Sequence, residues 1–459
     1  MDIIAAIATG PSPTAIGIVR VSGQGCFTCC DRVFRAFNGS PFSQQTPRNM
    51  VFGEMLDAQG RVIDQGLAAR FPGPHSYTGE DSAEFHCHGS PVVLRELLGA
   101  LFAAGARQAK AGEFTRRAFL NGRLDLTQAE AVVDLIDAET AAAARNAAAQ
   151  LDGGLRRTLE PIQDALLEIT SWFYAVVDYP DEDIEDVQPE QVAEALSSAD
   201  EKLTALLATC QRGKVLKSGV RTAIVGRPNA GKSSLLNALA GYERAIVTDV
   251  PGTTRDTVEE SVLCGGVLLR LIDTAGIRDT ADVVEQMGVE RSRKAIEAAD
   301  LVLVVIDIST IPTLESDETL RLARASGKPF LVVFSKLDLY HPPAYVKVPG
   351  TGGDPAGAVY LSSVTGEGLH VLEDTVAALF PAGDPKEAGS LLTDQRQEEA
   401  ARRARDAVRR AKGALESGLT PDAVLTDAEE ALDALGELTG RTARDEIVSR
   451  IFSRFCVGK

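Results

Sequence analysis

Hydrophobic and polar positions change their spacing several times along the 459-residue chain. Residues 1–119 hold short apolar runs such as Ala15 to Val21, with turn-forming residues at Gly10, Pro11 and Gly23. Apolar runs of this length between turn residues are typical of strands. The pattern therefore predicts a small α+β domain over residues 1–119.

Residues 120–218 have the spacing of long helices. Apolar residues recur at the helical period there, as in the segment Ala129 to Ile136. Helical spacing returns over residues 381–459, after a hinge that contains proline and glycine. The two segments together predict an all-α helical domain into which residues 219–380 are inserted.

Residues 219–380 alternate apolar strands with helical segments, which is the pattern of a parallel sheet covered by helices. We expect a separate α/β domain here. Its predicted strands are Thr222 to Val225, Leu268 to Ile272, Leu301 to Ile306, Phe330 to Phe334 and Val359 to Ser362.

Composition narrows the class of protein further. Apolar residues make up 44% and charged residues 24%, which is ordinary globular usage. The net charge of −18 repels a phosphate backbone, so contact with nucleic acid should be local. The chain shows no signal peptide and no apolar run of membrane-spanning length, so we expect a cytoplasmic protein without membrane contact. Seven scattered cysteines indicate reduced thiols rather than a disulfide framework.

The segment Gly226-Arg-Pro-Asn-Ala-Gly231-Lys232-Ser233 follows a predicted strand and precedes a predicted helix. This is the spacing and the setting of a P-loop, in which backbone N–H groups cradle phosphates. In such a loop the lysine meets the β- and γ-phosphate oxygens and the serine ligates Mg²⁺. We expect nucleotide contacts from Asn229, Ala230, Gly231, Lys232, Ser233 and Ser234.

Two further segments stand where the switches of a GTPase belong. Thr253 and Thr254 lie in the loop Thr248 to Asp256, where a threonine, which we take to be Thr254, completes Mg²⁺ coordination. The second segment follows a predicted strand, so it places a carboxylate near the metal and a glycine near the γ-phosphate. Its residues are Asp273, Thr274, Ala275 and Gly276.

A base-recognition element, Ser335-Lys336-Leu337-Asp338, follows the fourth predicted strand. The Asp338 carboxylate can accept both hydrogen bonds that guanine N1 and N2 offer, and adenine offers no such pair, so GTP rather than ATP is expected. Ser335 replaces the asparagine of the usual Asn-Lys-x-Asp element, and its shorter side chain predicts reduced guanine affinity. The next strand ends in a further base contact, formed by Ser362, Ser363 and Val364.

The residue after the second switch is Ile277, which cannot orient water as the glutamine of Ras-like enzymes does. Water must therefore be positioned by other groups. Asn229 and the loop from Thr248 to Thr253 offer oxygens that can hold a monovalent cation where an arginine finger would act.

Three segments are similar to the MnmE family of tRNA-modification GTPases: the P-loop, the switch Gly252 to Asp256 and the C-terminus Phe455 to Lys459. The resemblance covers essentially the whole chain. It implies that K⁺-dependent dimerisation of the α/β domains switches on hydrolysis, and that Glu285 organises water. Its implied K⁺ ligands are Asn229, Thr248, Val250 and Thr253.

The first domain resembles the folate-binding and dimer-forming region of the same family, through Gly17 to Gly23, Thr78 to Glu84 and Asn121 to Asp125. The resemblance implies a homodimer and a site for a tetrahydrofolate derivative. The C-terminus would have to fold back onto this domain. The implied folate contacts are Arg20, Glu84, Arg123 and Lys459.

Three features allow two interpretations each. Cys456 is either an activated nucleophile or a docked C-terminal thiol. His86 and His88 share one strand face, as a partial metal site or as packed side chains. A basic run on a predicted helix either tracks a tRNA backbone or is a solvated surface. The run comprises Arg402, Arg403, Arg405, Arg409, Arg410 and Lys412.

The resemblance implies a GTPase that acts on tRNA with an FAD-dependent MnmG-like partner. Together they would modify C5 of the wobble uridine, as carboxymethylaminomethyl or aminomethyl, with a methylene-tetrahydrofolate one-carbon unit. Two alternatives stay open at this point. One is a ribosome-assembly GTPase of the Era or Der type, and the other is a nucleotide-dependent scaffold that is not an enzyme.

Overall fold

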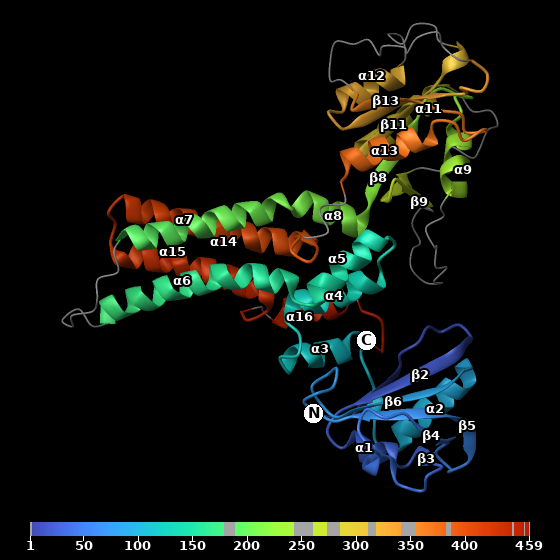
Figure 1. Ribbon diagram of the computed structural model, residues 1–459, viewed down its shortest axis with the longest axis vertical. Coiled ribbons are helices and arrows are strands. Elements are labelled where there is room, and N and C mark those ends of the chain that lie inside the picture. Colours follow the sequence, from blue (N-terminus) through green and yellow to red (C-terminus); the bar gives the residue numbers. More distant parts are fainter. Residues whose placement is uncertain are drawn as a thin grey trace. The chain divides into compact units, whose positions relative to one another are not determined.

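Figure 1 shows a computed structural model of the chain. It describes residues 2–178, 189–242, 260–272, 285–310, 318–340, 355–381, 387–442, 445–453 and 455–458. The chain divides into two compact units. The first comprises Met1–Val133, Gln150–Asp200 and Arg403–Lys459, and the second comprises Asp134–Ala149 and Glu201–Arg402. The domain boundaries expected from the sequence stay a prediction.

A seven-stranded sheet opens the first unit, with the strand order β3-β4-β5-β6-β2-β1-β7. Neighbouring strands are antiparallel, except that β1 pairs with β7 in parallel. The strands are β1 (Ile4–Ile7), β2 (Thr14–Ser22), β3 (Phe34–Ala36), β4 (Val51–Leu56), β5 (Val62–Phe71), β6 (Ser82–Gly89) and β7 (Arg107–Gln108).

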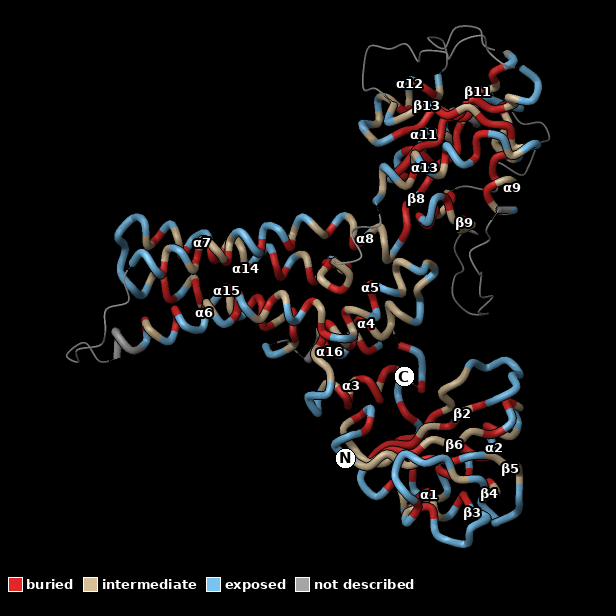
Figure 2. Tube along the Cα trace, in the orientation of Figure 1, coloured by how far each residue is buried: buried red, intermediate tan, exposed pale blue. Residues whose placement is uncertain are grey.

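One face of this sheet packs against α1 (Cys26–Cys30) and α2 (Pro91–Ala103). Because side chains alternate between the two faces of a strand, Val19 and Phe85 fall on the covered face and are buried, as Figure 2 shows for β2 and β6. Cys26 lies in the same core, and burial raises the pKa of its thiol. The first domain is therefore an α+β layer.

The predicted long helices are present. In α6 the residues Leu155, Leu159, Ile162 and Leu166 are buried at helical spacing, and this helix packs along α15. None of the described helices is both long and apolar enough to cross a membrane. The helices outside the two sheet domains are α3 (Glu113–Leu120), α4 (Leu126–Ile136), α5 (Ala141–Leu151), α6 (Gly154–Asp178), α7 (Pro189–Ala208), α8 (Cys210–Ser218), α14 (Gln395–Glu416), α15 (Pro421–Thr439) and α16 (Asp445–Phe452).

The C-terminal segment folds back onto the first domain. Val457 forms an antiparallel bridge with Ala111, and the Gly112 N–H donates to the carbonyl of Cys456 at 3.3 Å. Gly458 has a φ of 102°, and a Cβ there would lie 2.3 Å from the Ile7 carbonyl oxygen. The expected position of Lys459 requires this arrangement, although Lys459 itself lies outside the described residues.

The second unit contains a six-stranded sheet with the order β13-β12-β11-β8-β10-β9. All neighbours are parallel except β9, an antiparallel edge strand that the sequence analysis missed. The five predicted strands are confirmed, with the last one ending at Tyr360. The strands are β8 (Val220–Val225), β9 (Glu260–Cys264), β10 (Val267–Ile272), β11 (Leu301–Asp307), β12 (Phe330–Ser335) and β13 (Gly357–Tyr360).

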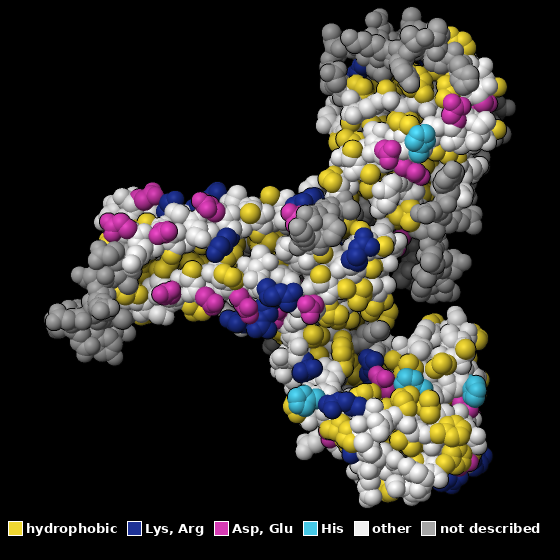
Figure 3. Space-filling model, in the orientation of Figure 1, with side chains coloured by type: hydrophobic (Ala, Val, Ile, Leu, Met, Phe, Trp, Pro, Cys, Tyr) yellow, Lys and Arg dark blue, Asp and Glu magenta, His cyan; other side chains and the backbone are white. Residues whose placement is uncertain are grey.

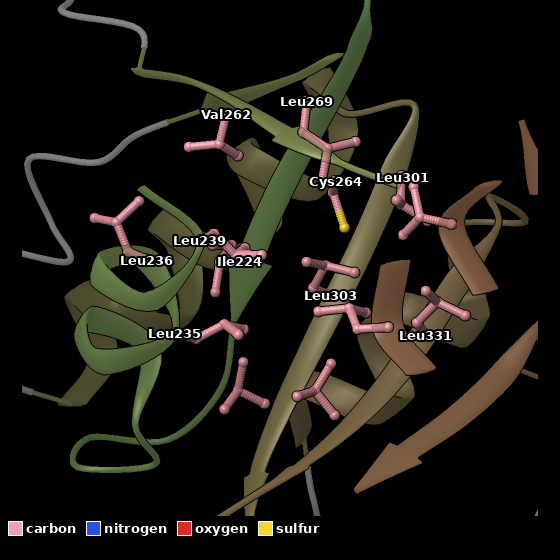
Figure 4. Close-up of a cluster of buried hydrophobic side chains, with 14 of the residues drawn as sticks. Ile224, Leu235, Leu236, Leu239, Val262, Cys264, Leu269, Leu301, Leu303 and Leu331 are labelled. Atoms are coloured by element: carbon pink, nitrogen blue, oxygen red, sulfur yellow. The ribbon is translucent and has the colours of Figure 1, made fainter. Parts of the chain in front are cut away.

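Helices cover both faces of this sheet. Ile224 and Leu303 point to the face covered by α9 (Lys232–Tyr242) and α13 (Leu369–Leu379), where Figure 4 shows them packed with Leu235 and Leu239. The neighbouring positions Ala223 and Val304 point to the opposite face, covered by α11 (Glu285–Ala298) and α12 (Glu318–Ala325). Burial on both faces explains why these strands are continuous apolar runs.

A buried arginine fastens α3 to the first sheet domain. The Arg117 side chain is 4% exposed and pairs with Glu80 at 2.9 Å, with Glu113 at 3.1 Å and with Asp2 at 2.8 Å. Burial alone would raise the pKa of Glu113. Hydrogen bonds from Arg107, the Lys110 amide and Arg117 outweigh burial and lower this pKa to about 2. The fold therefore stabilises the ionised form of Glu113.

We predict that Glu113→Gln destabilises the protein in a pH-dependent way. A carboxylate with a lowered pKa stabilises the fold above its unfolded value of 4.5, and this contribution is lost as the pH falls through about 2. The free energy of unfolding, from urea titrations, should fall by about 2 kcal/mol at pH 7 and hardly change at pH 2. Glu54→Gln, which removes the exposed pair with Arg35, should cost under about 1 kcal/mol. An equal loss from Glu113→Gln at both pH values would contradict the assignment.

Candidate nucleotide site

The loop between β8 and α9 has the backbone of a phosphate cradle. Gly226, Asn229 and Gly231 have φ values of 153°, 60° and 95°. Left-handed residues at such positions turn successive N–H groups toward one point, which suits an anion. A Cβ on Gly226 would lie 2.3 Å from the Val305 carbonyl oxygen, so the loop passes too close to β11 for any other residue.

Lys232 opens α9, where the unpaired N–H groups of the first turn favour negative charge. Its ammonium donates to the carbonyls of Gly226 at 2.9 Å and Arg227 at 2.8 Å. Burial lowers the pKa of Lys232. A phosphate in the cradle would give this ammonium a counter-charge, as expected for the P-loop lysine.

Ser335 connects the base-recognition strand to the phosphate loop. It is 2% exposed at the end of β12, and its hydroxyl donates to the Ala230 carbonyl at 2.5 Å. A Cβ on Gly231 would lie 3.3 Å from the same hydroxyl oxygen, so the contact is close-packed. The expectation of reduced guanine affinity stays a prediction.

The base-recognition residues that follow β12 and β13 are joined by a hydrogen bond. The Ser362 hydroxyl donates to the Asp338 carboxylate at 2.6 Å and accepts from the Val364 amide at 3.2 Å. This orients a carboxylate that can accept from guanine N1 and N2. The Ser363 hydroxyl is buried and has no hydrogen-bond partner in the described part of the chain. A bound base would supply a polar neighbour to this hydroxyl, so the residues fit a nucleotide.

Sequence reasoning missed Asp307. It ends β11, and its carboxylate accepts from the Lys336 ammonium at 2.6 Å and from the Ser309 hydroxyl at 2.7 Å. Burial raises the pKa of Asp307, but these hydrogen bonds outweigh it and hold the pKa below its ordinary value. The available signal was an acidic residue directly after an apolar strand, at the sheet edge that carries the site.

The switch residues lie outside the described residues, so their expected roles stay predictions. α11 begins at Glu285, but the structure does not describe the position of its side chain. Ser233 and Asn229 are the described members of the expected Mg²⁺ and K⁺ ligand sets. The undescribed residues are Thr248, Val250, Thr253, Thr254, Asp273, Thr274, Ala275 and Gly276.

Two of the expected folate residues pair with each other in the first domain. The Arg20 guanidinium lies 2.8 Å from the Glu84 carboxylate, and it stacks over the rings of Tyr77 and Phe114 at 5.5 Å and 5.8 Å. Arg123 packs close to Gly79, on the same loop as Tyr77. Sequence reasoning assigned Arg20 and Glu84 separate contacts and did not foresee their pairing.

The structure also describes the surroundings of the candidate thiol Cys456 and of the candidate metal ligands His86 and His88. Cys456 has an exposed side chain. His86 lies 3.5 Å from Glu84 and His88 lies 2.8 Å from Asp64, and the described residues hold no group of three or more side chains that could bind a metal ion.

Partners neutralise most of the basic run on α14. Arg403 pairs with Glu437, Arg409 lies 2.8 Å from Asp200 and Arg410 lies 2.8 Å from Asp427. Arg402 and Arg405 also pair with carboxylates, those of Glu398 and Asp406. This favours the solvated surface over a track for the tRNA backbone.

A strand, a phosphate cradle and a helix, with an oriented aspartate at the same sheet edge, define a P-loop GTPase. Family models described as the MnmE helical domain and the GTP-binding protein TrmE N-terminus match residues 126–456 and 3–123. The chain belongs to the family of tRNA modification GTPases named MnmE, and it is a GTP hydrolase.

The similarity to curated relatives runs from end to end. The tRNA modification GTPase MnmE of Symbiobacterium thermophilum is 44% identical over 100% of this chain and 99% of the relative. That of Roseiflexus sp. strain RS-1 is 42% identical over the same shares. The solved G domain of the T. maritima FeoB iron transporter is 25% identical, covers 35% of this chain and 97% of that chain, and has a TM-score of 0.23. The curated relatives decide against a ribosome-assembly GTPase and against a scaffold without activity.

We predict that Ser335→Ala weakens GDP binding by roughly tenfold, because the buried Ala230 carbonyl loses its hydrogen-bond partner. Ser335→Asn, which restores the usual residue, should bind GDP at least as well as the native chain. Ser326→Ala serves as the control, because its hydroxyl makes local contacts at the end of α12, where it donates to the Ala323 carbonyl and accepts from the Lys328 amide. Fluorescent GDP titrations measure all four proteins. Native affinity in Ser335→Ala would refute the connection.

Proposed function

We propose that the chain is a K⁺-activated GTPase that modifies C5 of the tRNA wobble uridine together with an FAD-dependent MnmG-like partner. The one-carbon unit comes from a methylene-tetrahydrofolate. The observation that carries the proposal is the Asp338 carboxylate, held by Ser362 on the sheet edge that also bears the P-loop. Membership in a family of tRNA modification GTPases supplies the substrate class.

Different residues of the nucleotide site bind the phosphates, the base, the metal ions and the attacking water. Lys232 and the loop amides hold the phosphates, while Asp338, Ser362 and Ser363 hold the base. When bound, Mg²⁺ and K⁺ supply positive charge beside the phosphates. Ser233 and Thr254 would hold the Mg²⁺, with the Asp273 carboxylate near it, and Asn229 with Thr248, Val250 and Thr253 would hold the K⁺. Glu285 organises the attacking water.

The first domain is proposed to bind the folate and to form a homodimer, with the α/β domain inserted into the helical domain. Arg20 and Glu84 offer a donor and an acceptor side by side, which suits a ligand with both carboxylates and a pterin edge. The docked C-terminus supports a contribution from Lys459. The exposed Cys456 thiol lies on the same segment.

We predict that Asp338→Asn exchanges guanine for xanthine. An asparagine amide can donate to the C2 carbonyl of xanthine, whereas the guanine amino group loses its acceptor. GDP affinity should fall by roughly a hundredfold or more, and xanthosine diphosphate affinity should rise. Competition against labelled nucleotide measures both. In the native chain, displacement of labelled GDP by ATP as readily as by GTP would refute guanine recognition.

We predict that phosphate release from GTP is fast in K⁺ buffer and slow in Na⁺ buffer. With K⁺ present, Glu285→Ala should lower kcat by roughly a hundredfold, because the water loses its organising carboxylate, and GDP affinity should be unchanged. Glu290→Ala, on the exposed surface of the same helix, is the matched control. Unchanged turnover in Glu285→Ala would remove this residue from the mechanism.

We predict that cells lacking the gene lose the C5 modification of wobble uridines. Mass spectrometry of digested tRNA measures the modified nucleosides, and the native gene should restore them. A Lys232→Ala gene should not, because its product cannot hold the phosphates. Normal wobble uridines in the deletion strain would contradict the proposed function.

A further inference from the structure

A lysine side chain crosses the edge of the second sheet between the base-recognition carboxylate and the phosphate cradle. In that sheet β11 lies between β8, which leads into the P-loop, and β12, which leads to Asp338. Lys336 directly follows β12, and its ammonium reaches the carboxylate of Asp307, the last residue of β11, at 2.6 Å. The Lys336 side chain therefore occupies part of the edge along which a nucleotide would extend from the cradle to Asp338.

The backbone of Lys336 is also held in an unusual conformation. Its φ is 64°, in the left-handed region that residues other than glycine seldom adopt. The Lys336 carbonyl accepts from the Leu339 N–H at 3.0 Å, and the Leu337 N–H donates to the Leu361 carbonyl at 3.2 Å. Backbone conformations of this kind persist where the surrounding structure holds them, and they are concentrated at ligand sites. Lys336 is thus fixed at both its backbone and its ammonium end.

Asp307 is itself oriented by its own segment of chain. One carboxylate oxygen accepts from the Ser309 N–H at 2.9 Å and from the Ser309 hydroxyl at 2.7 Å, which leaves the other oxygen facing Lys336. The Asp307 side chain is 12% exposed and the Lys336 side chain is 31% exposed. The ion pair is therefore more than a contact between two freely moving surface groups, since one partner is anchored before the other arrives.

The charge of Asp307 alone would oppose a nucleotide. Its carboxylate lies at the sheet edge that carries the phosphate cradle, where a negative charge repels phosphates. Figure 3 shows further Asp and Glu side chains on the surface of the α/β domain, for example over α13, and the whole chain has a net charge of −18. Pairing with Lys336 neutralises Asp307. Any benefit of Asp307 to nucleotide binding must therefore come through the lysine that it holds.

We propose that Asp307 is a positioning residue for the bound nucleotide, which acts by fixing the side chain of Lys336 beside the guanine base. Asp338 can contact only the base edge that carries N1 and N2, so the faces of the ring need other neighbours. A lysine stem can cover such a face while its ammonium stays paired, and a fixed stem loses little freedom on binding. This inference rests on the proposed recognition of guanine by Asp338.

Asp307→Ala in the full chain tests the proposal. Fluorescent GDP titration, with competition by unlabelled GDP and inosine diphosphate, measures both affinities. Asp307→Ala should weaken GDP by at least roughly tenfold, because Lys336 loses its anchor. Inosine lacks the 2-amino group of guanine but has the same ring faces. Its diphosphate should therefore weaken by the same factor, so that the preference for GDP over inosine diphosphate stays as in the native chain.

Asp300→Ala is the matched control. Asp300 precedes the opposite end of β11, where its half-exposed carboxylate lies 3.3 Å from the Arg221 guanidinium. It should bind GDP as the native chain does. Asp307→Asn keeps an oxygen for Ser309 and presents amide hydrogens to Lys336, so it should weaken GDP as Asp307→Ala does. It carries the test if Asp307→Ala does not fold, which thermal unfolding of each variant shows.

A double-mutant cycle separates action through Lys336 from a general effect on the loop. Lys336→Met should weaken GDP by at least roughly tenfold, and adding Asp307→Ala should weaken it no further. Additive losses would overturn the proposal. So would native GDP affinity in both Asp307 variants, or a reduced preference for GDP over inosine diphosphate, which would mean that Asp338 itself has moved. Guanine recognition is tested separately, because ATP competes with labelled GDP in the native chain.

Discussion

A hydrogen bond from the Ser335 hydroxyl to the Ala230 carbonyl joins the phosphate loop to the base-recognition segment of the nucleotide site. Parallel strands end at one sheet edge, and β11 lies between β8 and β12. The P-loop after β8 and the Asp338 loop after β12 therefore emerge at the same edge, on either side of β11. That topology sets the distance between phosphate cradle and base-recognition carboxylate. The hydroxyl then fixes it, because a buried donor and a buried acceptor satisfy each other.

Around that edge, the polar contacts form a chain of mutual support. Asp307 holds Lys336, and Ser362 holds Asp338. The residues proposed to recognise guanine are therefore held in place without a ligand, which would reduce the ordering cost of binding. The first unit uses the same principle elsewhere, since Arg117 and the bridge between Val457 and Ala111 hold the first sheet domain to α3 and to the C-terminus.

The fold was predictable wherever the local sequence of a single element determines its structure. Continuous apolar runs identified the buried strands of the α/β sheet, and the P-loop spacing identified the cradle. The antiparallel edge strand β9 was missed because pairing direction is set by the neighbour rather than by the strand. The hydrogen bond from Ser335 to Ala230 and the ion pair of Arg20 with Glu84 were also missed, because each joins residues that are distant in sequence. For the same reason the sequence left the basic run on α14 open between an RNA track and a solvated surface, whereas the structure shows that Asp200 and Glu437 neutralise part of it.

A crystal structure of the chain with GDP tests the central claim most directly. The account predicts the Asp338 carboxylate oxygens within hydrogen-bond distance of guanine N1 and N2, the β-phosphate against the amides of residues 229–233, and the Ser335 hydroxyl still on Ala230. A guanine base bound away from Asp338, or a Ser335 hydroxyl released from the loop, would contradict it.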